Sequence, residues 1–157
     1  MGYRNYRNLE ASLIDYIAAQ FTADGWSGIR TEKAFAEIYK GTLPAICVSM
    51  EESDAISREI GSKSYLENIL VSIRIFATSD GQRLDLASWM LSKIMPGIDY
   101  YTYTITSGTV SSKILTGRVV ILENTVNRKE LKNVDNLDSI DRYRHILTFK
   151  VRVSTTS

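Results

Sequence analysis

Apolar residues near the beginning of the chain recur at every fourth position, which is the spacing of one face of a helix. Asp24 and Gly25 follow this stripe, and an aspartate–glycine pair is typical of a helix end. We therefore predict an amphipathic helix over residues 6–21. The pattern of residues 31–39 suits a short helix without deciding the matter. The stripe of the first helix consists of Leu9, Leu13, Ile17 and Phe21.

Two later segments alternate between apolar and polar residues with the period of two that is typical of a strand. The first opens after Pro44 and has Ile46 and Val48 on one face. The second, residues 66–78, has the clearest alternation. Between them, residues 51–63 are polar and somewhat acidic, so we predict a loop there. The apolar face of the second strand carries Ile69, Val71, Ile73, Ile75 and Ala77.

A second helix is predicted over residues 83–95, because apolar residues again follow the helical period and Pro96-Gly97 then ends it. Its expected buried stripe consists of Leu84, Ala87, Leu91 and Ile94. Alternating segments follow at residues 100–106, 113–124 and 143–153, and we predict three further strands there. Helices and strands in separate blocks indicate an α+β fold, a mostly antiparallel sheet with helices packed on one face. The length of 157 residues suits a single domain, residues 1–157.

Composition narrows the possible partners. The formal net charge is +1, which gives no general attraction to nucleic acid or to an anionic membrane. No apolar run approaches the roughly 20 residues of a membrane helix, and the polar N-terminus does not resemble a signal peptide. The one cysteine, Cys47, cannot form a disulfide within the chain. We expect a soluble protein with no membrane partner.

His145 is the only histidine, and it follows Asp141 by four residues and Ser139 by six. A serine–histidine–aspartate site would need a constrained turn at the serine and an oxyanion hole. Ser139 has no glycine within two residues on either side, so the sharp turn of a nucleophile is missing. The strand period instead places His145 in the apolar row of the last strand. We therefore predict a structural histidine.

Metal and phosphate sites are not indicated either. Asp135, Asp138 and Asp141 are spaced by threes, but calcium loops need closer ligands and a glycine at the sharp turn. We interpret these aspartates as part of a solvated loop, and the basic residues within 128–132 as a mixed-charge surface. No glycine-rich phosphate loop occurs. We expect no catalytic residue, no cofactor and no metal, and hence no enzyme.

Residues 100–117 are unusual because Lys113 is their only charged residue and the rest are rich in Tyr, Thr, Ser and Ile. The segment alternates on both sides of a serine–glycine pair, which predicts a hairpin. Tyrosine-rich surface with little charge suits a protein–protein interface. An internal hairpin buried under a helix explains the same pattern equally well, and both interpretations stay open. The candidate interface residues are Tyr101, Tyr103 and Ile105.

Several strings, taken in order, suggest a family. The N-terminal amphipathic helix is followed by LPAICV (residues 43–48) and by ILVSIRIFATSDGQRLDLASWMLSKI (residues 69–94). DRYRHILTFKVRVS (residues 141–154) enters the final strand. In these strings and their order, the chain resembles the tail terminator proteins of tailed bacteriophages, neck proteins that cap the tail tube and join it to the head.

The resemblance implies a sheet with flanking helices and assembly into a homo-oligomeric ring, commonly a hexamer, around a DNA channel. Its partners would be the tail tube protein and a head-completion or connector protein. DNA would pass through without sequence-specific binding. The protein would be located in the virion after assembly in the host cytoplasm. Lys113 and Arg118 are candidate channel-facing residues, because they flank an expected loop in an uncharged region.

Two alternatives remain open from the sequence. Within the same structural class, a head-completion or tail tube subunit uses similar small sheet folds. A small ligand-binding domain or enzyme is the alternative from a different class, and its pocket would carry no visible motif.

Overall fold

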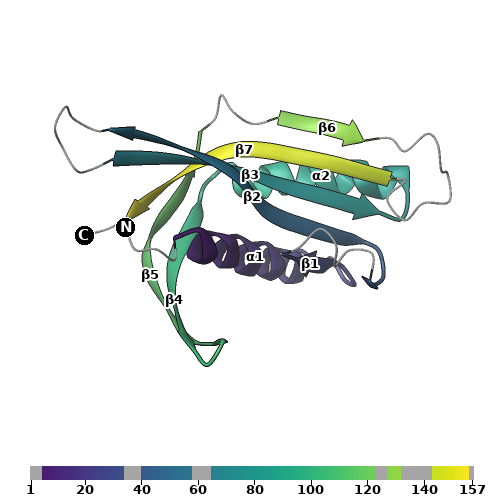
Figure 1. Cartoon of the computed structure of the whole chain (residues 1–157). Coiled ribbons are helices and arrows are strands. Elements are labelled where there is room, and N and C mark those ends of the chain that lie inside the picture. The colour runs from purple at the N-terminus through teal and green to yellow at the C-terminus, as the bar shows by residue number, and fades with distance from the viewer. Residues whose placement is uncertain (1–4, 34–39, 58–64, 123–126, 132–142, 156–157) are drawn as a thin grey trace.

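The computed structural model describes residues 5–33, 40–57, 65–122, 127–131 and 143–155. Figure 1 shows the elements along the chain. They are α1 (Asn5–Ala23), β1 (Arg30–Glu32), β2 (Ala45–Ser57), β3 (Tyr65–Ala77), α2 (Asp80–Ile94), β4 (Ile98–Thr106), β5 (Thr109–Ile121), β6 (Asn127–Leu131) and β7 (Tyr143–Thr155).

The strands of the described residues form one seven-stranded sheet in the order β1-β2-β3-β7-β5-β4, and β6 pairs with β7 beside this path. Every pairing is antiparallel except that of β1 with β2. β7 is the central strand: β3 pairs with it over most of its length, while β6 and β5 pair with its first and last parts. The predicted mostly antiparallel sheet is confirmed.

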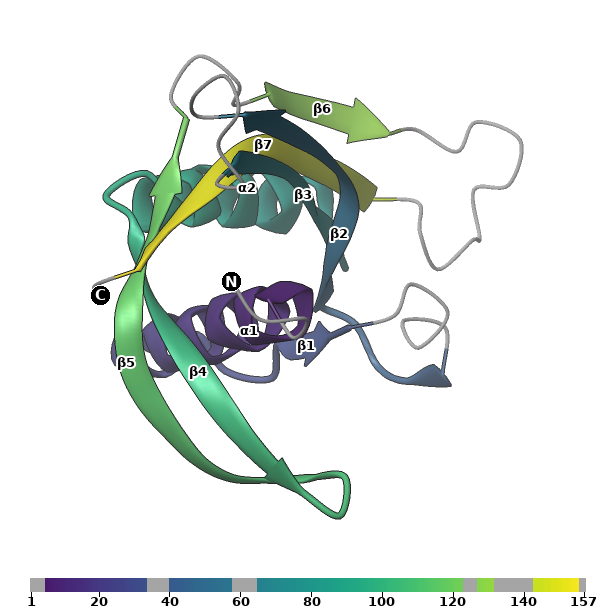
Figure 2. The same cartoon turned by 60° about the vertical axis from the view of Figure 1, so that its left-hand side comes forward.

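Both helices lie on the inner face of the curled sheet (Figures 1 and 2). The predicted α+β arrangement with helices on one face is therefore confirmed. The core between helices and sheet is made mostly of branched aliphatic side chains from the inner faces of the strands, with a few aromatic ones, together with the helix stripes. From α1 and the three central strands its members include Leu9, Leu13, Ile17, Phe21, Ile46, Val48, Ile69, Val71, Ile73, Ile75, Leu147, Phe149 and Val151.

The predicted stripe of α1 is confirmed, but that of α2 is partly wrong. Leu84 is 50% exposed, whereas Leu86 and Met90 are fully buried. The helix also begins earlier than predicted, because the Ser79 hydroxyl caps it by accepting a hydrogen bond from the backbone N–H of Gln82 at 3.2 Å. The inward face therefore runs through Arg83, Leu86, Ala87, Met90 and Ile94.

The predicted loop over residues 51–63 is wrong for its first part, since β2 continues to Ser57. The strand persists through polar residues because its backbone pairs with the apolar β3 strand. Its register shifts between Met50 and Glu52, so Glu51 is the extra residue of a β-bulge. Residues 58–63 lie outside the described residues.

Two other predictions of local structure can be compared. In the ambiguous stretch 31–39, the structure has β1 at Arg30–Glu32, and residues 34–39 lie outside the described part. β6 was not predicted. Its residues NRKEL lack any apolar alternation, and the strand forms by pairing its backbone with β7.

An aromatic cluster joins the end of α1 to α2. Phe21 stacks on Trp89 with ring centroids 4.5 Å apart, and Trp26 meets the same ring edge-on at 6.0 Å. Asp24 accepts hydrogen bonds from the Trp89 indole and pairs with Lys93, each at 2.7 Å. These bonds, that of Lys93 first, lower the pKa of the Asp24 carboxyl. The cluster fixes the two helices to each other under the sheet.

Candidate interaction surface

His145 lies in β7 with its side chain on the inner face, as the strand period predicts, and is 8% exposed. Its Nδ1 atom lies 2.9 Å from a guanidinium nitrogen of Arg83, which is also buried. Asp80 binds the same guanidinium through two nitrogens, at 2.7 and 3.1 Å. His145 thus links β7 to α2 in the structure. Ser139 and Asp141 lie outside the described residues.

Within the described ranges no group of histidine, cysteine or acidic side chains could hold a metal ion, and no helix is long and apolar enough to cross a membrane. Asp135 and Asp138 fall outside those ranges. Cys47 is fully buried on the outer side of the sheet, and this burial raises the pKa of its thiol. A buried protonated thiol is a poor nucleophile.

The predicted hairpin over residues 100–117 exists and extends away from the body as a two-stranded arm (Figure 2). Ser107 and Gly108 form its turn, with φ angles of 52° and 79°. Positive φ at both central residues is the geometry that matches the twist of a tight hairpin, and glycine adopts it without strain. We call residues 101–115, from the first bulge to the tip and back, the β4–β5 arm.

The base of the arm is packed against α1. Tyr103 is 5% exposed, and its hydroxyl donates a hydrogen bond to Asp15 at 2.6 Å. Burial, followed by the nearby Asp15 carboxylate, raises the pKa of this phenol. Tyr103 is therefore internal to the chain, and it could serve an interface only by holding the arm in place. Tyr101 and Ile105 are partly exposed.

Two buried polar side chains of α1 also satisfy the outer edge of β4. The backbone N–H of Tyr101 donates to the Ser12 hydroxyl at 3.0 Å, and that of Tyr103 donates to the Asn8 side-chain oxygen at 3.3 Å. An edge strand with free N–H groups invites pairing with another chain. α1 blocks that pairing on β4, which explains why Asn8 and Ser12 are polar yet buried.

The β5 side of the arm is open. All residues from Thr109 to Leu115 are exposed, including the apolar Val110 (51%), Ile114 (64%) and Leu115 (56%). β5 pairs with β7 only from Gly117 onward. Among the described residues, the edge of β5 facing away from β4 therefore has no strand partner over this stretch. The sequence signal for this surface was the absence of charge, but it singled out β4 side chains rather than those of β5.

Lys113 and Arg118 do not flank a loop, because both lie within β5. Lys113 lies over the Tyr101 ring, 4.6 Å from its centroid, and its ammonium is 3.6 Å from Asp15. Arg118 donates a hydrogen bond to the carbonyl of Pro96 at 3.0 Å and is exposed. The predicted strand thus begins at Thr109, four residues before Lys113.

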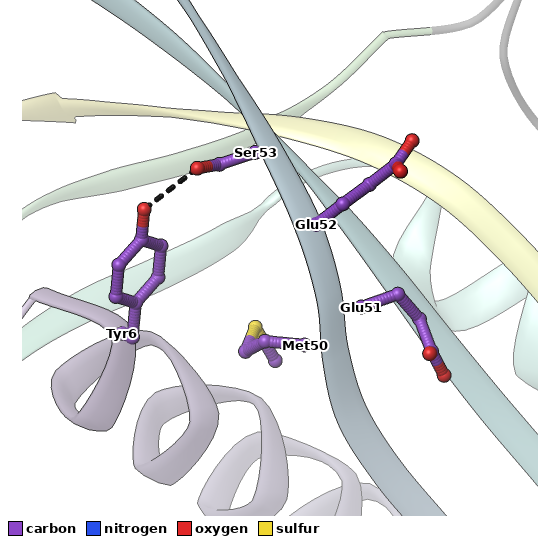
Figure 3. A pocket seen from close by; sticks show the side chains of 5 residues that line it. All are labelled: Tyr6, Met50, Glu51, Glu52 and Ser53. Atoms are coloured by element: carbon purple, nitrogen blue, oxygen red, sulfur yellow. Dashed lines mark hydrogen bonds between the residues drawn. The ribbon is translucent and has the colours of Figure 1, made fainter.

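A shallow pocket lies at the β2 bulge, between this strand and the start of α1 (Figure 3). Met50 points towards α1, and the Tyr6 hydroxyl bonds with the Ser53 hydroxyl at 2.7 Å and also donates to Glu67. Glu51 and Glu52 extend from the other side of the strand. The pocket is lined by polar side chains together with the apolar Met50.

The bulge turns Glu51 onto the outer face of the sheet. Its carboxylate accepts hydrogen bonds from Ser72 and Ser49 and pairs with Arg74 at 3.1 Å. These contacts, that of Ser72 first, lower the pKa of Glu51. The charge of Glu51 is thus used within the chain.

No protein-family model and no curated protein matches this chain. Among solved structures, a chain described as "Virion of native gene transfer agent (GTA) particle" is similar. The alignment covers 97% of this chain and 98% of that one, with 15% sequence identity and a TM-score of 0.47.

Proposed function

We propose that this chain is a structural protein of a virion, and specifically a tail terminator: a ring, expected to be a hexamer, that caps the tail tube and joins it to the head. The gene transfer agent chain belongs to a virion, and we propose a particle of that kind for this chain. The sequence strings that resemble tail terminators support the specific role.

The observation that carries the proposal is the open side of the β4–β5 arm. Val110, Ile114 and Leu115 are more than half exposed on a projecting hairpin whose strand edge lacks a partner among the described residues. Such an edge is normally shielded in a monomeric protein. A subunit of a permanent assembly can carry such an edge, because a neighbouring chain covers the edge once the assembly has formed.

The candidate channel residues keep this role as part of the proposal, although their contacts differ. Arg118 is exposed and held only by the Pro96 carbonyl among its described hydrogen bonds, so its charge is free to face DNA. Lys113 already interacts with Asp15 and Tyr101. We therefore favour Arg118 as the channel residue. The near-neutral net charge of +1 suits a channel through which DNA must slide.

Electron microscopy of tail tubes tests the proposal. Tubes assembled from the tail tube protein of the same particle should stop growing when this chain is added, with extra ring-shaped density at one end. If the added chain carries a gold label and the label lies along the whole tube, the chain is a tail tube subunit instead. Tubes of unchanged length that carry no label would contradict a tail-capping role.

A further inference from the structure

Several strand edges of the sheet have no strand partner within the described residues, and two of them, on different hairpins, carry charges of opposite sign. One is the edge of β5 from Thr109 to Leu115, on the side away from β4. The other is the edge of β2 that continues beyond Cys47, where the pairing with β1 stops. Unpaired N–H and C=O groups along an edge can accept a further strand.

The two edges carry opposite charge. The β5 edge contains Lys113 and no acid, whereas residues 51–55 of β2 contain three acids and no base. Lys113 lies 3.6 Å from Asp15 of its own chain, but about half of its side chain stays exposed. Asp54 already pairs with Lys150 at 3.0 Å, and Glu51 is bonded on the outer face. Glu52 is exposed and makes no ion pair with any described residue. It is the acid available to a cation from outside.

The arm cannot reach the β2 edge of its own chain. α1 lies between β4 and β2 and contacts both (Figure 2). The two edges therefore do not pair with each other within one chain. The two edges are complementary in charge and belong to the same sequence. A second copy of this chain can therefore offer its β2 edge to the β5 edge of the first, and its β5 edge to the β2 edge of another copy.

Pairing of identical edges is disfavoured by charge. Two β5 edges would bring Lys113 towards its own copy, and two β2 edges would oppose their acids, and like charges opposite each other destabilise a strand pair. Pairing of unlike edges is head-to-tail, which closes into a ring when the rotation between copies allows.

We infer that the β4–β5 arm of one copy adds to the β2 edge of the next, with Lys113 near Glu52. This inference rests on the proposed ring and names its contact surface. The pairing would also cover Ile114 and Leu115, which point to opposite faces of β5. The half-buried Met50 in the pocket at the β2 bulge offers apolar surface on one of these faces. Lys113 is then a subunit-interface residue, which leaves Arg118 for the channel.

A charge swap tests this contact. Lys113→Glu and Glu52→Lys are made singly and together, and ring formation is measured by mass photometry over a concentration series, with and without tail tubes. Each single variant should assemble about tenfold more weakly, because it places like charges across the contact. The double variant should regain assembly close to that of the original chain. Asp85→Lys, an exposed charge reversal on α2, is the matched control and should assemble normally.

Circular dichroism of each variant checks folding, and the rescue separates the two roles of Lys113. Glu52 makes no contact with Lys113 inside one chain, so recovery in the double variant supports contact between copies. Rings that form equally well in all variants would overturn the inference while leaving the ring itself intact. Folded single variants that fail, with a double variant that also fails, would overturn it too. A natural chain that forms no ring in any condition would instead overturn the proposed function together with the inference.

Discussion

Tyr103 shows how one side chain divides the β4–β5 arm into an internal and an external half. Its ring is buried against α1 and its hydroxyl is bonded to Asp15. The sequence predicted only that an uncharged, tyrosine-rich hairpin would be either interface or core. Which tyrosine is buried depends on where α1 crosses the strand, a long-range contact that alternation along the chain cannot reveal. His145, in contrast, was placed by local period alone, although its Arg83 partner was not foreseen.

Replacing Tyr103 by phenylalanine should lower the free energy of unfolding by about 0.5–1.5 kcal/mol at neutral pH, the usual net contribution of one hydrogen bond. Urea denaturation measures this difference. Tyr101→Phe is the matched control, because the Tyr101 hydroxyl makes no described hydrogen bond, and it should change stability less. Equal losses in both variants would mean that the bond to Asp15 contributes nothing.

The contribution of Tyr103 to stability should also depend on pH. The pKa of Tyr103 is raised in the folded chain above its ordinary value of 10.0, so folding favours the protonated phenol. Its contribution is complete below pH 10 and is lost as the pH rises through the folded pKa. The stability of the natural chain should therefore fall relative to Tyr103→Phe above pH 10. If the natural chain instead became still more stable than Tyr103→Phe as the pH rose above 10, the raised pKa of Tyr103 would be wrong.

At the scale of elements, β5 joins the arm to the body: it pairs with both β4 and β7 near Gly117 and with β4 alone in the arm. The strong alternation of residues 66–78 and 143–153 predicted β3 and β7 well, because a strand that packs one face on the core carries apolar residues at every second position. β6 and the second half of β2 were missed, because their sequences lack the apolar alternation of a strand and only the pairing with β7 and β3 identifies them. The bulge at Glu51 is likewise set by the partner strand and leaves no mark in the sequence.

Gly117 sits where β5 meets β7, and a Cβ there would lie 2.1 Å from the Ser154 carbonyl oxygen. Backbone atoms cannot move aside as a flexible side chain can. Gly117→Ala should therefore lower the free energy of unfolding by at least about 1–3 kcal/mol, as overpacking does. It should also speed hydrogen exchange of the backbone amides where β5 pairs with the end of β7. Gly81→Ala is the control, because a Cβ there meets nothing within 4 Å and the residue lies in α2. It should be neutral or slightly stabilising. If both variants unfold at the same urea concentration as the natural chain, β5 and β7 are not joined as described.

At the scale of the whole molecule, a compact sheet-and-helix body carries one arm with an open, apolar strand edge (Figure 2). The α+β class followed from the blocks of helical and strand periods. The arm's reach away from the body did not, because the same alternation fits a strand inside a sheet or outside it. The proposed assembly as a ring would connect these features: the body has its own core, and a neighbouring copy would complete the arm.

Mass photometry of the purified chain, with and without tail tubes, tests this claim most directly. The proposal predicts a closed species at a fixed multiple of the 17.7 kDa chain, six copies for a hexamer, either alone or on contact with tubes. A single peak at the mass of one chain in both conditions would contradict it.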